Sequence, residues 1–294
     1  MSTDFRHHLK SVAETLEGVL GAHLPKAVGH QAIIAEAMRY AAMGGGKRLR
    51  PFLLVETANM FGASTAGVWR AAAGLECLHV YSLVHDDLPC MDDDDLRRGK
   101  PTVHKAYSEA IATLAGDGLL TFAFELVASA SEDPIIGLQL VKSLAIAGGV
   151  HGMIGGQVID ITVSERERSE ALITELQDLK TGALIDYACH AGALIAGANQ
   201  TDVRAVRAYA RDIGLAFQIK DDILDTEGDA TVVGKAVGKD AELGKATFVS
   251  ILGLEPAREK AKLLGERAKL HLKPYGVSAE KLCEAVDFVL NRTH

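Results

Sequence analysis

Six aspartates stand within ten residues of the segment LVHDDLPCMDDDDLRRGKP, which begins at Leu83, and two arginines and a lysine follow them. Taken alone, such an acidic run is more often a solvated loop than a binding site. Carboxylates are nevertheless the ligands that hard cations such as Mg²⁺ prefer, and Mg²⁺ usually shares them with phosphate oxygens. Arginine side chains suit bidentate phosphate binding. The segment therefore raises the hypothesis of a site for an anion that arrives with a metal.

A second acidic motif, DDILD, begins at Asp221. Asp221 and Asp225 are four residues apart, so both project from one helix face, on a stripe that includes Gln218. Like charges at this spacing destabilise an isolated helix, which favours a bound cation that offsets their repulsion. The alternative is that the acids have no function and lie at a solvated helix end. Both motifs stand at the end of an apolar helix. Two such helices facing each other would form a carboxylate-lined mouth at one end of a bundle.

Basic residues occur in clusters along the rest of the chain, in the segments GGGKRLRP, LKTGALI and TVVGKAVGKDAELGKAT. Each cluster alone has an ordinary explanation, such as a basic helix C-terminus or a lysine that extends to solvent. No segment fits GxxxxGK[ST], which argues against a nucleotide kinase. Together, two carboxylate clusters and several basic clusters indicate a metal-bridged diphosphate site, with a second anion site beside it.

The elements that must position these residues are predicted to be helices almost throughout, because alternating strand patterns are scarce. One helix is expected to end at the three glycines from Gly44, another near Pro89 and a third before Pro134. The chain is 48% hydrophobic but only 5% aromatic, which is typical of helices that pack closely on small residues. We therefore expect an all-α fold, a helical bundle that forms a single domain over residues 1–294.

Composition also excludes several classes of protein. The net charge of −8 argues against a nucleic-acid partner, which would call for a basic stripe. The four cysteines stand alone, so neither a structural zinc site nor a disulfide framework is expected. The polar start MSTDFRHHLK does not resemble a signal peptide, and no uninterrupted apolar run approaches the roughly 18 residues that span a bilayer. We expect a cytoplasmic protein without stable membrane insertion.

Six motifs carry a resemblance to a known family: GGGKRLRP, HDDLPCMDDDDLRRGKPTVH, GGQVIDI, LKTGALI, FQIKDDILD and GKAVGKDAELGKAT. In this order, and from about Ala37 to Val249, the chain resembles the trans-isoprenyl diphosphate synthases, specifically those of the bacterial farnesyl diphosphate synthase (geranyltranstransferase) type. It departs from them in GKATFVS, where relatives often have a tyrosine and a proline after the threonine. The resemblance implies the isoprenoid synthase fold, a helical bundle around a central cavity, usually as a homodimer.

The resemblance also implies an activity in isoprenoid biosynthesis. The protein would be a Mg²⁺-dependent prenyltransferase that condenses isopentenyl diphosphate with dimethylallyl and geranyl diphosphate to give farnesyl diphosphate. A geranylgeranyl diphosphate synthase is the alternative within the class. A terpene cyclase would need no second anion site, and a non-catalytic subunit of a heteromeric synthase would be expected to lose an aspartate motif.

The roles of individual residues follow from the same resemblance. The Mg²⁺ ligands, for three ions per active site with substrate bound, would be Asp86, Asp92, Asp221 and Asp225. The allylic diphosphate would be bound by Arg97, Lys180, Thr181, Gln218, Lys235 and Lys245. Isopentenyl diphosphate would be bound by Lys47, Arg50, His79 and Arg98.

Product length is expected to depend on Tyr81 and Ser82, five and four residues before Asp86. At 1.5 Å per helical residue, Tyr81 lies about 7.5 Å below Asp86 along the helix, a plausible floor for a growing chain. In the family an aromatic residue at this position accompanies the C15 product. The alternative is that Tyr81 is an ordinary packed residue with a satisfied hydroxyl.

Overall fold

The computed structural model describes residues 3–163, 169–227 and 247–292. Helices make up 79% of the structure, and the only strands among the described residues are β1 (Leu96–Arg97) and β2 (Lys100–Pro101), an antiparallel pair. The all-α prediction is confirmed. Of the predicted site residues, Lys235 and Lys245 lie outside the described residues, so their roles stay predictions.

The chain divides into two compact units. The N-terminal unit comprises Arg6–Val55 and Ser64–Val141, and the C-terminal unit comprises Glu56–Ala63 with the described residues from Lys142 onward and up to Phe5. This division does not test the prediction of a single domain over residues 1–294, nor that of a central cavity. In chain order the helices are α1 (Thr3–His23), α2 (Ala32–Ala42), α3 (Leu49–Met60), α4 (Ala66–Asp86), α5 (Val103–Ala106), α6 (Glu109–Ala128), α7 (Pro134–Gly148), α8 (Met153–Thr162), α9 (Glu170–Gln177), η2 (Asp178–Gly182), α10 (Ala183–Ile195), α11 (Gln200–Glu227), α14 (Phe248–Leu252), α15 (Leu254–Leu272), η3 (Lys273–Ala279) and α16 (Glu280–Asn291).

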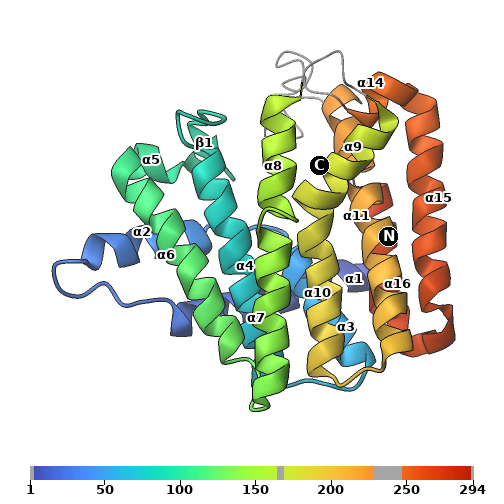
Figure 1. Cartoon of the computed structure of the whole chain (residues 1–294), viewed down its shortest axis with the longest axis horizontal. Helices are drawn as coiled ribbons and strands as arrows, with labels where there is room; N and C mark the ends of the chain where they lie inside the picture. The colour runs from blue at the N-terminus through green and yellow to red at the C-terminus, as the bar shows by residue number, and fades with distance from the viewer. Residues whose placement is uncertain (1–2, 164–168, 228–246, 293–294) are drawn as a thin grey trace. The chain divides into compact units, whose positions relative to one another are not determined.

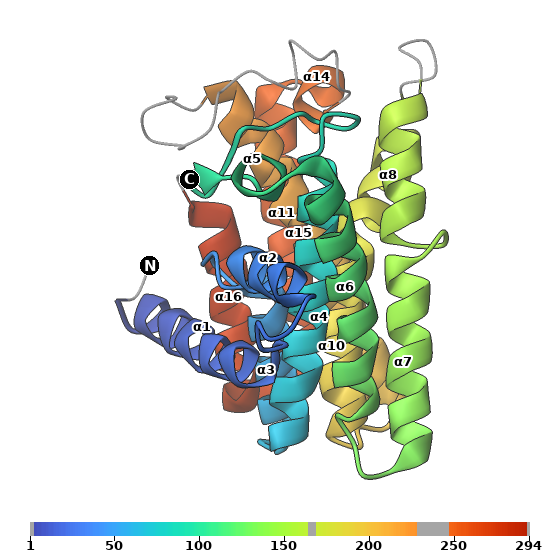
Figure 2. The same cartoon turned by 90° about the vertical axis from the view of Figure 1, so that its left-hand side faces the viewer.

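In the N-terminal unit, α4 and α6 lie side by side along their length (Figures 1 and 2). They approach closely because Gly74 has no side chain, and a Cβ there would lie only 2.8 Å from the carbonyl oxygen of Ala123. The Thr65 hydroxyl accepts a hydrogen bond from the amide of Val68 and so caps the start of α4. The helix ends at Asp86, as predicted from Pro89, and thus delivers the first aspartate motif at its C-terminus.

In the C-terminal unit, α10, α11 and α15 are neighbours, with α11 between the other two (Figure 1). The apolar face of α11, which includes Leu215, Ile219 and Ile223, packs against Phe248 and the small residues of α15. Burial of these side chains holds α11 in place over its length. The helix continues to Glu227, so it carries the whole DDILD motif in its last turns.

Two helical stretches, Glu109–Ala128 and Pro134–Thr162, are apolar and long enough to cross a membrane when up to two charged residues are allowed within 18. The sequence expectation had considered only uninterrupted apolar runs. The finding is weak evidence for a membrane protein, because core helices of soluble proteins pass the same test. The prediction of no stable membrane insertion therefore stays a prediction.

Candidate active site

The loop after α4 folds back on the helix that carries it. The amide of Asp92 donates to the carbonyl of Asp86 at 2.9 Å, and the amide of Met91 donates to the carbonyl of Leu88 at 2.8 Å. Pro89 prevents the helix from continuing through this segment. The backbones of Asp86 and Asp92 are thereby brought together, as a shared role for the two carboxylates requires.

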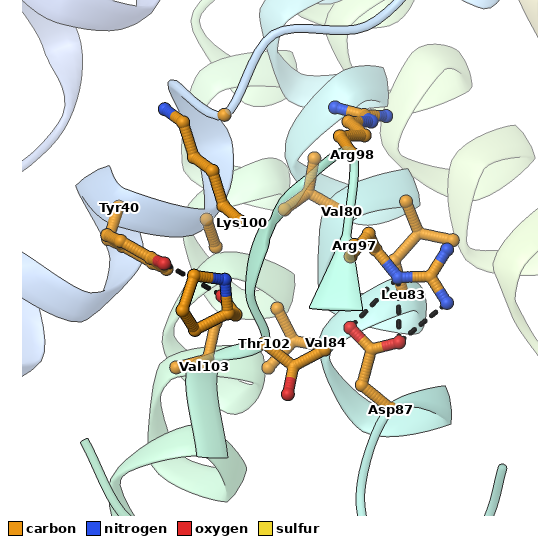
Figure 3. A pocket seen from close by; sticks show the side chains of 13 residues that line it. Tyr40, Val80, Leu83, Val84, Asp87, Arg97, Arg98, Lys100, Thr102 and Val103 are labelled. Atoms are coloured by element: carbon orange, nitrogen blue, oxygen red, sulfur yellow. Dashed lines mark hydrogen bonds and ion pairs between the residues drawn. The ribbon is translucent and has the colours of Figure 1, made fainter. Parts of the chain in front are cut away.

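The second aspartate of this motif has a different environment. Asp87 is buried, and its two carboxylate oxygens accept hydrogen bonds from Nε of Arg97 at 2.7 and 2.9 Å (Figure 3). Burial raises the pKa of Asp87, and the Arg97 guanidinium opposes that shift. Asp94 lies 3.7 Å from the same guanidinium. Arg97, predicted to bind an allylic diphosphate, is therefore oriented beside the first aspartate motif by two carboxylates.

A pocket in the N-terminal unit lies between the ends of α2 and α4 and the β1–β2 hairpin (Figure 3). Its lining includes three basic side chains, those of Arg97, Arg98 and Lys100. Arg98 donates to the carbonyl of Gly45 and so links the β1–β2 hairpin to the turn at Gly44, Gly45 and Gly46, called the glycine turn below. A Cβ on Gly46 would lie 2.6 Å from the Arg98 guanidinium carbon, so a side chain there would displace the guanidinium, and the φ of 126° at this position also favours glycine. Lys100 was noted in the sequence after the two arginines but was given no role.

The remaining residues predicted to bind isopentenyl diphosphate lie in the same unit. Nη1 of Arg50 lies 3.3 Å from Nε2 of His79, and Lys47 is exposed at the glycine turn. Burial, reinforced by the charges of nearby arginines, holds the pKa of His79 well below 6.5. His79 is therefore neutral near pH 7 and accepts or donates according to its tautomer. The arrangement suits an anion held by guanidinium groups beside a neutral imidazole.

In the second aspartate motif, as in the first, one of two adjacent aspartates is buried and the other is more exposed. Asp222 is buried, and it accepts hydrogen bonds from the Gln218 amide at 3.1 Å and from the Phe248 backbone amide at 2.7 Å. The Thr181 hydroxyl donates to the Gln218 side chain at 3.2 Å. Two predicted allylic-site residues, Thr181 and Gln218, thus meet beside the motif. Asp222 positions Gln218 and the start of α14, while Asp221 is partly exposed.

Lys180 lies in η2, a π-helical turn, a feature found frequently at functional sites. Its Nζ donates to the carboxylate of Asp160 at 2.6 Å, which orients the side chain. Asp160 belongs to the motif GGQVIDI, and a Cβ on Gly156 of that motif would lie 2.6 Å from Cα of Lys180. The motif therefore supplies both the space and the carboxylate that position Lys180. Sequence reasoning quoted the motif but gave no role to Asp160.

The two aspartate motifs offer carboxylate ligands for a metal ion, but these do not form a complete coordination site by themselves. Across the described ranges, no group of three or more His, Cys, Asp or Glu side chains converges as a metal site. Mg²⁺ is usually held by one or two carboxylates plus substrate phosphate oxygens, so such a cage is not required. In the N-terminal unit, Asp86 and Asp92 have adjacent backbones and suit a cation that a bound diphosphate completes. In the C-terminal unit, the partly exposed Asp221 is a candidate ligand of the same kind.

Comparison with known proteins bears on these motifs. A model of the polyprenyl synthetase family matches residues 31–275. The chain belongs to the polyprenyl synthetase family. This confirms the resemblance to trans-isoprenyl diphosphate synthases, and with it the prediction of a prenyltransferase. Enzymes of this family are generally metal-dependent.

Three relatives illustrate the similarity. A farnesyl diphosphate synthase from Geobacillus stearothermophilus is 42% identical over 292 residues, which cover 97% of each chain. A geranylgeranyl diphosphate synthase from Cyanophora paradoxa is 38% identical over 286 residues, covering 96% of this chain and 94% of the relative. The apo structure of an FPP/GFPP synthase from Zymomonas mobilis matches with a TM-score of 0.91 and 44% identity, over 98% of this chain and all of that one.

Proposed function

We propose that this polyprenyl synthetase is a farnesyl diphosphate synthase, which joins isopentenyl diphosphate first to dimethylallyl and then to geranyl diphosphate. The observation that carries the proposal is that the basic side chains of the N-terminal unit fall into two groups. Arg97 is oriented beside the first aspartate motif, whereas Arg50 stands against His79. Two anionic substrates require two such groups. The farnesyl diphosphate synthases among the relatives support the same assignment.

The chemistry follows from the charge of the leaving group. Asp86, Asp92, Asp221 and Asp225 are the residues that we propose would hold Mg²⁺, and the ion would supply positive charge to the diphosphate that departs from the allylic carbon. Arg97 and Lys180, each held by a carboxylate, add fixed positive charge as the C–O bond breaks. Arg50 and Arg98 hold isopentenyl diphosphate so that its double bond attacks the allylic cation, and transfer of a proton from the product cation to the departed diphosphate restores an alkene. Water must be excluded, since it would quench the cation.

Product length is the finer part of the proposal, and geranylgeranyl diphosphate remains the alternative product. The buried ring of Tyr81, on the helix that ends at Asp86, supports termination at C15. The deciding experiment incubates the pure protein with Mg²⁺, dimethylallyl diphosphate and excess isopentenyl diphosphate, and identifies the products by mass. Farnesyl diphosphate as the main product supports the proposal. A C20 product would replace it with the alternative, and no condensation at all would overturn both.

We also propose that the protein is a homodimer. Three exposed apolar residues of α8 recur at intervals of four and three positions and so form one apolar stripe: Ile154, Val158 and Ile161. Ile146 near the end of α7 and Val150 in the turn between the two helices are exposed as well. The exposed fractions of these residues run from 44% for Ile154 to 69% for Val150. A contiguous apolar stripe of this kind is typical of a protein–protein interface, and a second copy of the chain is the occupant we propose.

Light scattering after size exclusion tests the dimer. The double variant Ile154→Glu/Val158→Glu places two charges in the stripe and should shift the mass to that of one chain. Leu263→Glu, at an equally exposed leucine on α15, is the matched control and should leave the mass unchanged. A wild-type protein with the mass of one chain would refute the proposal.

A further inference from the structure

Three basic residues follow the glycine turn, and the middle one has a different environment from the other two. Lys47 is exposed and Arg50 lies against His79, but the side chain of Arg48 is completely buried. The backbone of Arg48 has φ of 49°, in the left-handed region that non-glycine residues seldom adopt. Such a conformation persists only where the surroundings enforce it. The contacts of Arg48 must therefore hold this turn in place.

Those contacts are ionic and buried. Nη1 of Arg48 donates to the carboxylate of Glu76, which is 2% exposed, and Nη2 donates to the carbonyl of Ala42 at 2.6 Å. Glu17 adds a second carboxylate, 3.8 Å from the guanidinium. The pair thus ties the turn after α2 to the middle of α4, two elements that approach from different parts of the N-terminal unit.

The Arg48–Glu76 ion pair lies next to the Arg50–His79 contact in the chain. Glu76 lies three residues before His79 on α4, so the two side chains share one helix face. Arg48 lies two residues before Arg50, which reaches His79. The ion pair and the Arg50–His79 contact are therefore two successive links between the same two elements. Any shift at the first link moves the second.

Stability alone does not account for such a pair. Replacing a buried ion pair by apolar residues of similar volume is often neutral or stabilising, because desolvation offsets the attraction. The two directional hydrogen bonds of the Arg48 guanidinium, to Glu76 and to the carbonyl of Ala42, do fix the geometry between the elements that carry these groups. We propose that Arg48 and Glu76 are positioning residues, which set Lys47 and Arg50 against His79 for isopentenyl diphosphate. This inference rests on the proposed function, because that function identifies the ligand.

The test separates positioning from stability with a double variant. Arg48→Met/Glu76→Leu removes both charges and fills the space, so its unfolding midpoint in urea should fall less than that of Arg48→Met, which leaves the Glu76 carboxylate buried without this partner. Its KM for isopentenyl diphosphate should nevertheless rise about tenfold, equivalent to about 1.4 kcal/mol of binding free energy. Its KM for geranyl diphosphate should change less than twofold. A stable double variant with wild-type KM values for both substrates would overturn the proposal.

Two further variants keep the test decisive if the double variant fails to fold. Glu76→Gln retains the size and a hydrogen-bond acceptor and should show a smaller rise in the same KM, whereas wild-type KM values would count against positioning. Arg267→Met is the matched control, since it removes the arginine partner of another buried carboxylate, Asp212. It should lower stability and leave the ratio of the two KM values unchanged. A raised ratio there would mean that lost stability alone produces the effect.

Calorimetry distinguishes this inference from the proposed function. Wild-type protein that binds isopentenyl diphosphate more tightly than the double variant does supports the positioning role, whatever product the enzyme makes. Equal binding by the two proteins overturns it. The identity of the wild-type product tests the proposed function separately.

Discussion

Arg292 donates to the carboxylate of Asp221 at 2.9 Å, and its guanidinium carbon lies 3.8 Å from the ring centroid of Phe217. The same guanidinium donates to the carbonyl of Phe217 at 2.6 Å. Arg292 is almost fully buried, whereas Asp221 is 44% exposed. A cation therefore already occupies one side of the carboxylate that we propose as a metal ligand.

Removing this charge should strengthen metal binding. In Arg292→Gln, a divalent ion no longer competes with the guanidinium, so affinity should rise about fivefold, equivalent to about 1 kcal/mol for a partly exposed pair. Mn²⁺ binding followed by electron paramagnetic resonance, without diphosphate, measures this directly. Arg258→Gln removes an arginine that pairs with Glu227 on the same helix as Asp221 and serves as the control. Equal Mn²⁺ affinities in Arg292→Gln and the wild type would contradict the expectation.

The acidic run after α4 should divide into essential and dispensable carboxylates. Asp86→Ala should leave a folded helical protein whose turnover falls about a thousandfold, because the lost ligand acts on leaving-group charge worth several kcal/mol. Asp93→Asn is the control, since Asp93 has φ of 48° and asparagine tolerates that conformation. Its turnover should stay within about twofold of wild type. Steady-state assays at saturating Mg²⁺, with circular dichroism to check folding, decide the matter. Comparable losses in both variants would remove the distinction.

The sequence predicted the elements better than the partners of the site residues. Pro89 and the glycines from Gly44 mark helix ends because they act on the local backbone, and both helices end where expected. The burial of Arg48, in contrast, depends on Glu76, which is 28 residues away. The sequence does not show that these two residues meet, because nothing in the residues around an arginine distinguishes a buried one from an exposed one.

The same limit applies to the carboxylates of the two aspartate motifs. Asp221 and Asp222 are adjacent in the chain, yet one is partly exposed and the other is buried against the Phe248 amide. Helical periodicity shows that Asp221 and Asp222 lie on different faces of α11. It does not show which of these faces α14 will cover. Asp160 was missed for a similar reason, because its role appears only when Lys180 is brought to it.

His79 should make stability depend on pH. Burial keeps its pKa well below 6.5 in the folded state, together with the charges of Arg50 in α3, Arg48 in the turn before α3, and Arg97 and Arg98 in the β1–β2 segment. Below about pH 6.5 the unfolded chain binds a proton that the folded protein does not, so the free energy of unfolding decreases as pH falls. His79→Gln should lose less stability between pH 7.5 and 5.5, by up to about 1.4 kcal/mol per pH unit.

Urea unfolding of both proteins at several pH values measures this difference. His151→Gln, at an exposed histidine, is the control and should follow the wild-type pH profile. If His79→Gln also follows the wild-type profile, the imidazole is not the group that makes the folded protein sensitive to acid.

Asp222 should matter for stability more than for metal binding. In Asp222→Ala the Phe248 amide and the Gln218 side chain both lose an acceptor, which should reduce the free energy of unfolding by about 1–3 kcal/mol. Asp225→Ala, three residues further on the same helix, should change stability by less than about 0.5 kcal/mol. Urea unfolding compares the two. The opposite order of stabilities would show that Asp225, and not Asp222, anchors this end of α11.

Tyr81 packs within α4 against a residue next to the first aspartate motif. Its ring is 6% exposed and meets the imidazole of His85 edge-on, with centroids 5.7 Å apart. Nε2 of His85 lies 3.0 Å from the carbonyl oxygen of Thr113 on α6, so α6 anchors the imidazole that Tyr81 contacts. The hydroxyl of Ser82 donates to the carbonyl of His79 and is engaged within its own helix. Of the two residues predicted to set product length, Tyr81 is therefore the one that offers a rigid, bulky surface.

Replacing that ring should lengthen the product. Tyr81→Ala removes the surface about 7.5 Å below Asp86 along the helix, so chain growth should continue to C20 or beyond. Ionisation of the first substrate should be little affected, because the aspartates and Arg97 are unchanged. Product analysis by mass after reaction with excess isopentenyl diphosphate measures the shift. Tyr81→Phe keeps the ring without the hydroxyl and should still stop at C15, which separates bulk from hydrogen bonding. A Tyr81→Ala enzyme that still stops at C15 would place the floor at another residue, because the ring would then be part of the packing alone.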